Sequence, residues 1–236
     1  MKQEMKEALE EAFAAPEPTR KKEFLKKAEP PQISMVVFMR AQLPYIRKRV
    51  WLISALISLI AVLSAGYVEQ DCLWFIASLT PFIALGILTE NARSVTNNMV
   101  ELEMASRFSL KSVTLARLGV IGLLHFGVFC ILVSFTCKST LVSMGKVGVY
   151  LFVPYLLTTV LGLKMARRIP AKEVNFFLGG IAVMVSCLNF VMRAILPGLF
   201  EEKSFIWWLV LVICLLAGAW KEYKIMIEQT EEMAWN

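Results

Sequence analysis

Six apolar segments constrain the fold of this chain more than any other feature. Each is close to the roughly twenty residues that a helix needs to cross a bilayer core. The chain is 57% hydrophobic and has a mean hydropathy of +0.61, well above the average for soluble domains. An all-α integral membrane protein with six transmembrane helices is therefore predicted. The predicted spans are 50–68, 73–88, 115–135, 147–163, 176–196 and 205–220.

The distribution of Lys and Arg between the predicted loops sets the orientation. Eleven of these residues precede residue 50, and four follow each of the second and fourth spans. The loops on the opposite side contain only three, Lys138, Lys146 and Lys203. Because the positively charged loops of a membrane protein stay inside, we expect a multi-pass protein of a bacterial plasma membrane with both termini in the cytoplasm.

The chain outside the spans divides into three parts. Residues 1–33 are expected to form a cytoplasmic segment, amphipathic at first and basic over 20–27, and this basic run should contact anionic lipid headgroups rather than nucleic acid. Residues 34–48 are predicted to form an elbow helix in the membrane interface, because their apolar run is too short to span. The predicted transmembrane domain is 49–220, and 221–236 is a cytoplasmic tail.

The connection between the second and third spans has the most interpretable charge pattern. Glu103 and Arg107 are four residues apart with the acid first, which favours a helical ion pair, and apolar residues recur around them at helical spacing. This pattern predicts a short amphipathic helix over 99–108, followed by a helix that Ser109 caps. Such a helix suits the reception of force from a cytoplasmic partner. An ordinary interfacial loop helix remains the alternative.

Polar residues inside the spans are the candidates for a pathway. His125 is the only histidine of the chain, and its role is either a proton relay or substrate contact, or a packed imidazole bonded to a neighbouring helix. The fifth span carries Ala182, Ser186, Asn189 and Arg193 on one helical face. Arg193 lies one turn from the outer end, where snorkelling to the headgroups is the alternative to a substrate site.

Metal and enzyme chemistry find little support in the sequence. The five cysteines have no CxxC spacing and one histidine cannot build a His-rich metal site. A disulfide between Cys72 and Cys137 stays open. An intramembrane prenyl-protease would need adjacent glutamates and further histidines, and no phosphate-binding GxxxxGK[ST] loop is present. We therefore predict no enzymatic activity and no cofactor on this chain.

Taken together, the elbow segment, six spans, short outer loops and the sequence Glu-Leu-Glu-Met-Ala-Ser-Arg-Phe-Ser-Leu after the second span resemble the membrane subunit of a type II ATP-binding-cassette exporter. In that family the segment before span one is a connecting helix, and a coupling helix between spans two and three docks on the ATP-binding subunit. The family usually has a re-entrant hairpin between spans five and six, for which 197–204 is too short.

The resemblance implies an ATP-driven export function with ATP bound only to a cytoplasmic partner subunit. It implies two copies of this chain or a paired second permease, because six spans are half of the usual unit. It makes Glu101, Glu103, Arg107 and Lys111 docking residues. The rival prediction is a non-transporting membrane protein that anchors or regulates a cytoplasmic partner, of signalling or immunity type. A vitamin-uptake transmembrane component is a third hypothesis, drawn from the Ala-Arg pairs at inner boundaries.

Overall fold

The structure is a computed structural model, and all of its regular elements are helices in the part of the chain that it describes. The chain separates into two units, Met1–Met35 and Val36–Asn236, and the long helices belong to the second. Side chains are not described at 35, 65–67, 72, 93–96, 110–111, 139–140 and 230–233. The described residues are 3, 34–67, 72–96, 110–140, 143–170, 172–196 and 204–233.

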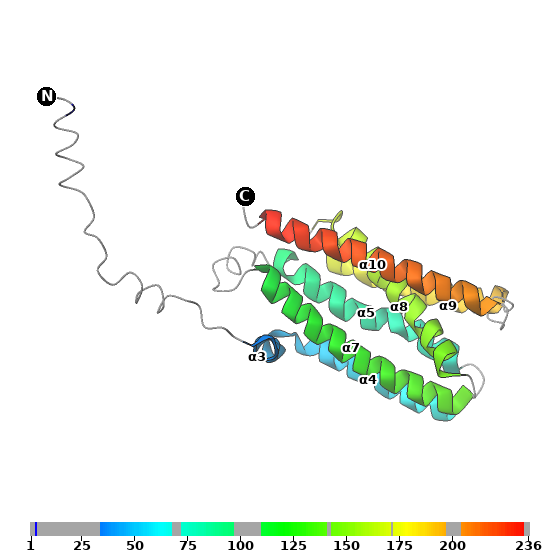
Figure 1. The fold of residues 1–236 in the computed structure, drawn as a ribbon. Helices are drawn as coiled ribbons and strands as arrows, with labels where there is room; N and C mark the ends of the chain where they lie inside the picture. The colour runs from blue at the N-terminus through cyan, green and yellow to red at the C-terminus, as the bar shows by residue number, and fades with distance from the viewer. Residues whose placement is uncertain are drawn as a thin grey trace. The chain divides into compact units, whose positions relative to one another are not determined.

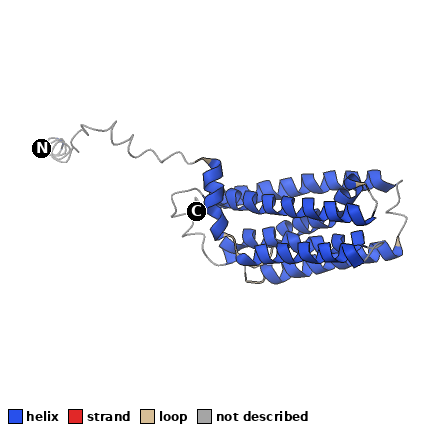
Figure 2. Cartoon of the chain, turned by 90° about the horizontal axis from the view of Figure 1, so that it is seen from below, coloured by secondary structure: helices blue, strands red, loops and turns tan. Residues whose placement is uncertain are grey.

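Long helices lie side by side along one direction, and the short helix α3 crosses one end of them (Figures 1 and 2). We call this end the α3 end. The helices alternate in direction, so α5 and α8 finish at the α3 end while α7 and α9 begin there (Figure 1). Their bounds are α3 Met35–Gln42, η1 Leu43–Tyr45, α4 Lys48–Tyr67, α5 Cys72–Thr96, α7 Leu110–Thr140, α8 Met144–Ala166, α9 Val174–Ile195 and α10 Phe205–Met233.

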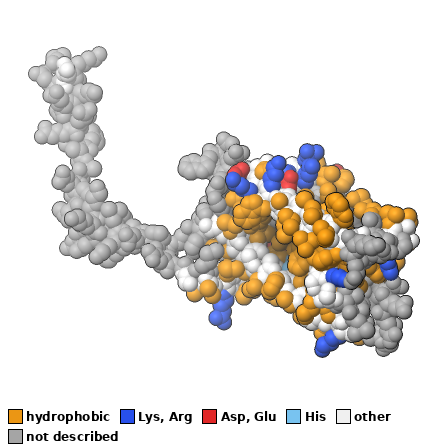
Figure 3. Space-filling view, turned by 45° about the vertical axis from the view of Figure 1, so that its right-hand side comes forward, with side chains coloured by type: hydrophobic (Ala, Val, Ile, Leu, Met, Phe, Trp, Pro, Cys, Tyr) orange, Lys and Arg blue, Asp and Glu red, His pale blue; other side chains and the backbone are white. Residues whose placement is uncertain are grey.

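Five helices, α5, α7, α8, α9 and α10, are long and apolar enough to cross a membrane. This agrees with an all-α, multi-pass membrane protein. Apolar side chains cover much of the described surface seen in Figure 3, and Lys and Arg side chains lie toward its margins. The apolar part of α10 has no buried residue, as expected of a helix whose outer face meets lipid. Helix α4 contains residues 50–67 of the first predicted span, and that span remains a prediction.

Helix α5 is the centre of the bundle, because it packs against α4, α7, α8 and α9. The largest core cluster joins α4, α5, α7 and α8 around Ile76, Ile83, Leu132 and Leu151. A smaller cluster at the α3 end joins α5, α8 and α9 through residues such as Leu88. Every neighbour of α5 therefore shares a buried face with it.

Helices α5 and α10 extend furthest beyond the predicted spans. Helix α5 continues for two turns past residue 88, to Thr96, because Leu88 and Ala92 belong to a buried apolar cluster with Leu163 and Val174. Helix α10 likewise continues past residue 220 to Met233. Hydropathy ends a span at its first charges, whereas a helix continues as long as one of its faces can be buried.

Proline interrupts the backbone ladders of both α5 and α8. Pro81 cannot donate to the carbonyl of Ala77. The Thr80 hydroxyl lies 2.9 Å from that carbonyl oxygen and 3.2 Å from the carbonyl oxygen of Leu151 on α8. Thr80 is fully buried. A neighbouring hydroxyl thus satisfies the carbonyl that proline frees, as a membrane helix requires.

Candidate functional site

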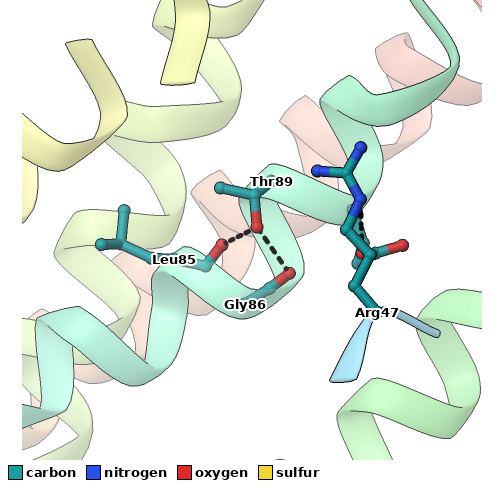
Figure 4. Close-up of polar contacts among 5 residues, drawn as sticks. Arg47, Leu85, Gly86 and Thr89 are labelled. Carbon is teal, nitrogen blue, oxygen red and sulfur yellow. Dashed lines mark hydrogen bonds and ion pairs between the residues drawn. The ribbon is translucent and has the colours of Figure 1, made fainter. Parts of the chain in front are cut away.

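A buried ion pair lies near the α3 end of the bundle. Nε of Arg47 is 3.7 Å from Oε1 of Glu90 on α5, and the Glu90 side chain is only 1% exposed. Figure 4 shows the Arg47 side chain reaching α5 from the chain just before α4. Arg47 is held there because its neighbours Ile46 and Val50 are buried against Val120 and other residues of α7. A carboxylate removed from water needs such a counter-charge.

One turn before Glu90, helix α5 is approached closely by two other helices. A Cβ added at Gly86 would lie 3.1 Å from Cγ1 of Val50 on α4 and 3.3 Å from Nε2 of His125 on α7. Glycine is therefore needed for the approach of these side chains to the backbone. The Thr89 hydroxyl donates to the carbonyl of Leu85 at 2.7 Å and also lies 3.3 Å from that of Gly86 (Figure 4), a back-bonding pattern that often bends helices.

His125 is 2% exposed and contacts Tyr155 on α8. Its Nδ1 lies 3.0 Å from the Tyr155 hydroxyl oxygen, and the two rings meet edge to face. Among the described residues, Nε2 has no hydrogen-bond partner. The sequence leaves His125 open between a functional role and a packed imidazole, and the structure shows an imidazole bonded to a neighbouring helix.

The tautomer of His125 can be assigned from this network. If the phenol donates to Nδ1, then Nε2–H is the single donor without an acceptor. If Nδ1–H donated instead, the phenol hydrogen and the Nε2 lone pair would both be left without partners among the described residues. Because each unpaired buried polar group costs about 1–3 kcal/mol, the first arrangement is favoured. His125 therefore presents Nε2–H toward Gly86 of α5.

The polar face predicted on α9 packs against α5. The Ser186 hydroxyl donates to the carbonyl of Ser78 at 2.6 Å, and the Asn189 amide donates to the Ser78 hydroxyl at 3.1 Å. The Arg193 guanidinium lies 5.0 Å from the centre of the Trp74 ring, within cation–π range. The structure thus brings Ser186, Asn189 and Arg193 together along α5. Their partners, Ser78 and Trp74, are not the partner of His125, which is Tyr155.

The predicted docking residues are the least described part of the site. Glu101, Glu103 and Arg107 lie outside the described residues, as does the whole of 97–109. Lys111 lies in the first turn of α7, and its side chain is outside the description.

The Cys137 thiol is free, while the side chain of Cys72 is not described.

Sequence reasoning missed Glu90, because the predicted second span ended at residue 88. A sequence signal existed. Glu90 follows Gly86 by one helical turn, on the helical face where a close-packed contact would continue. Tyr155 was also missed, since nothing in its apolar surroundings distinguishes it.

The arrangement provides fixed charges and hydrogen-bond donors in a medium of low dielectric, where each interacts strongly. In the described ranges, no three His, Cys, Asp or Glu side chains group as metal ligands would. No family model, curated protein or solved structure matches the chain.

Tyr155→Phe is expected to lower the free energy of unfolding by about 1–2 kcal/mol, because it leaves Nδ1 of His125 without its buried partner. Thermal unfolding in mild detergent, followed by circular dichroism, measures the change. Tyr223→Phe is the matched control, since Tyr223 is only half-buried. Equal effects of the two substitutions would contradict the importance of the His125–Tyr155 bond.

Proposed function

We propose that this chain is a six-span membrane protein with both termini in the cytoplasm. In this proposal helix α4 is the first span, and the exposed side chains of Lys48 and Arg49 at its beginning support a cytoplasmic position for that end. Helix α3 lies across the same end of the bundle (Figure 2), as an interfacial elbow would, and its Met39 packs against the α4–α7 cluster. The α3 end is then the cytoplasmic end.

On this basis, the chain acts as the permease subunit of an ATP-driven exporter, coupled to a separate ATP-binding subunit through the connection between α5 and α7. The observation that supports this proposal is the set of close contacts that join α5 to α7, to α4 and to Arg47. Glu90 of α5 pairs with Arg47, and Gly86 receives Val50 of α4 and His125 of α7. A displacement of the 97–109 connection would therefore move three helices together, which is how coupling passes through rigid elements.

Two copies of this chain, or one copy with a second permease, would complete the translocation unit. Glu101, Glu103, Arg107 and Lys111 would contact the ATP-binding partner, and ATP would bind there. The exposed apolar faces of α9 and α10 are compatible with contact to either lipid or a second membrane subunit.

A second candidate function is favoured by one observation. Ser186, Asn189 and Arg193, the best pathway candidates of the sequence, are used in contacts with α5 inside one chain. A closed bundle of this kind equally suits a membrane protein that anchors or regulates a cytoplasmic partner without transport.

Purification of the tagged full-length chain from its own host separates the two candidates. A soluble ATP-binding-cassette subunit that co-elutes in near-stoichiometric amount supports the permease. A signalling or transcriptional protein in its place, with no such ATPase, supports the anchoring function.

Charge reversal tests the docking residues. Glu103→Lys and Arg107→Glu are each expected to reduce the recovered ATP-binding subunit several-fold, because like charges at an interface disfavour association. Glu228→Lys is the control, since it reverses an acid of the exposed Lys224–Glu228 pair on α10 without touching the connection. Unchanged recovery with both docking variants would contradict the proposed coupling helix.

A further inference from the structure

The second half of α5, from Pro81 to Ala92, differs from the first half in how it is held. The backbone hydrogen-bond ladder of α5 is broken at Pro81. The Thr80 hydroxyl lies within hydrogen-bond distance of the freed carbonyl oxygen of Ala77 and of the carbonyl oxygen of Leu151 on α8. This fixes the break to α8 and leaves a point about which the rest of α5 can turn. Proline and glycine positions are where helices bend, and Gly86 follows within two turns.

Besides the apolar cluster that contains Leu88 and Ala92, three close contacts hold this second half in place. Glu90 pairs with Arg47 at 3.7 Å. Gly86 lies against Val50 and His125. On the other side, the Leu88 side chain fills the space that a Cβ at Gly162 of α8 would occupy. Of the three, only the ion pair joins opposite charges, and Arg47 keeps part of its side chain exposed.

The closed position covers a polar group that has no other use in the described structure. Nε2–H of His125 faces Gly86 and has no acceptor among the described residues. Burying such a donor is costly, and a shift of α5 away from α7 would remove that cost by exposing it. The buried donor therefore favours opening, and the Arg47–Glu90 pair opposes it.

We propose that the second half of α5 is a cover, hinged at Pro81 and latched by the Arg47–Glu90 pair, over a binding site at the His125 imidazole that opens toward the α3 end. The group it takes is a hydrogen-bond-accepting oxygen, since the exposed atom is a donor. The role of this site in binding a transported solute rests on the proposed export function. The hinged cover does not depend on that function.

The single histidine of the chain makes the cover directly measurable. Diethyl pyrocarbonate modifies accessible imidazoles, so its rate of reaction with the untagged or non-histidine-tagged protein reports exposure of His125 alone. Peptide mass spectrometry confirms the modified residue. Reaction through a rare open state proceeds at a rate proportional to the population of that state.

Glu90→Gln is expected to raise the rate about tenfold, which corresponds to about 1.4 kcal/mol in the opening equilibrium. Arg47→Gln is expected to do the same, and it provides the measurement if Glu90→Gln does not fold. Glu222→Gln is the matched control, because it breaks the Arg167–Glu222 pair between α8 and α10 and leaves α5 untouched; its rate should equal that of the wild type.

Addition of Pro81→Ala to Glu90→Gln should return the rate toward the wild-type value, because a restored backbone bond stiffens the hinge. Rates that rise equally in Glu90→Gln and Glu222→Gln, or that do not rise in folded Glu90→Gln, would overturn the cover. The readout needs no partner. If the modification rate rises tenfold but no ATP-binding subunit co-purifies, the export function is contradicted and the cover is not. If an ATP-binding subunit co-purifies but the rate does not rise, the cover is contradicted and the export function is not.

Discussion

Arg47→Leu is expected to lower the free energy of unfolding by about 3 kcal/mol, the largest loss that we predict from a single polar side chain. The substitution removes the positive charge that lies 3.7 Å from the carboxylate of Glu90, whose side chain is 1% exposed. Removal of one member of a buried pair costs about 3–5 kcal/mol. The lower end applies because 34% of the Arg47 side chain remains exposed.

The double variant Arg47→Leu with Glu90→Leu is expected to recover most of this loss. Two apolar side chains at these positions remove both charges of the pair, and such replacements of buried pairs are often neutral or stabilising. The four proteins of this cycle give the coupling energy of the pair directly. Thermal unfolding in one detergent at a fixed protein concentration is the measurement.

Lys224→Leu is the control for loss of a positive charge at the same end of the bundle. Lys224 and Glu228 form an exposed pair at 3.9 Å, and exposed pairs contribute about 0–1 kcal/mol. If Arg47→Leu were as mild as Lys224→Leu, or if the double variant were the least stable of the cycle, Glu90 would not depend on Arg47.

Hydropathy and periodicity predict the course of this fold well where lipid or core decides it. The predicted spans from the second onward each overlap a helix long and apolar enough to cross a membrane, because a bilayer demands long apolar segments from any chain. Helix α5 continues past the predicted end of the second span, and Glu90 is buried there beside Arg47, a residue from a distant part of the sequence. A hydropathy profile includes the charge of Glu90 but contains no information about the counter-charge of Arg47 that lies beside it in the fold.

The polar contacts show the same limit. The helical spacing of Ser186, Asn189 and Arg193 indicates that they share a face, and the structure agrees. Which residues of α5 they contact, Ser78 and Trp74, depends on the axial position of α9 relative to α5. The periodicity of one helix does not determine that position. For the same reason, nothing in the sequence pairs His125 with Tyr155.

Gly162→Val is expected to destabilise the protein by about 3 kcal/mol. A Cβ at this position of α8 would lie 2.4 Å from Cδ1 of Leu88 and 3.2 Å from Cδ2 of Leu178. Both leucine side chains are 1% exposed, so neither has free space into which to turn. Overfilling a packed core costs about 1–3 kcal/mol, and a branched side chain at a contact this short belongs at the upper end.

Gly148→Val is the matched control on the same helix, because nothing lies within 4 Å of a Cβ added there. Valine and glycine differ by only a few tenths of a kcal/mol in helix propensity, so this variant should unfold close to the wild-type temperature. Gly162→Val also presses on Leu88, which belongs to the cover. It should therefore raise the modification rate of His125 even where the ion pair is intact. A stable Gly162→Val protein would mean that Leu88 can leave its place freely, and the cover would then lack one of its three contacts.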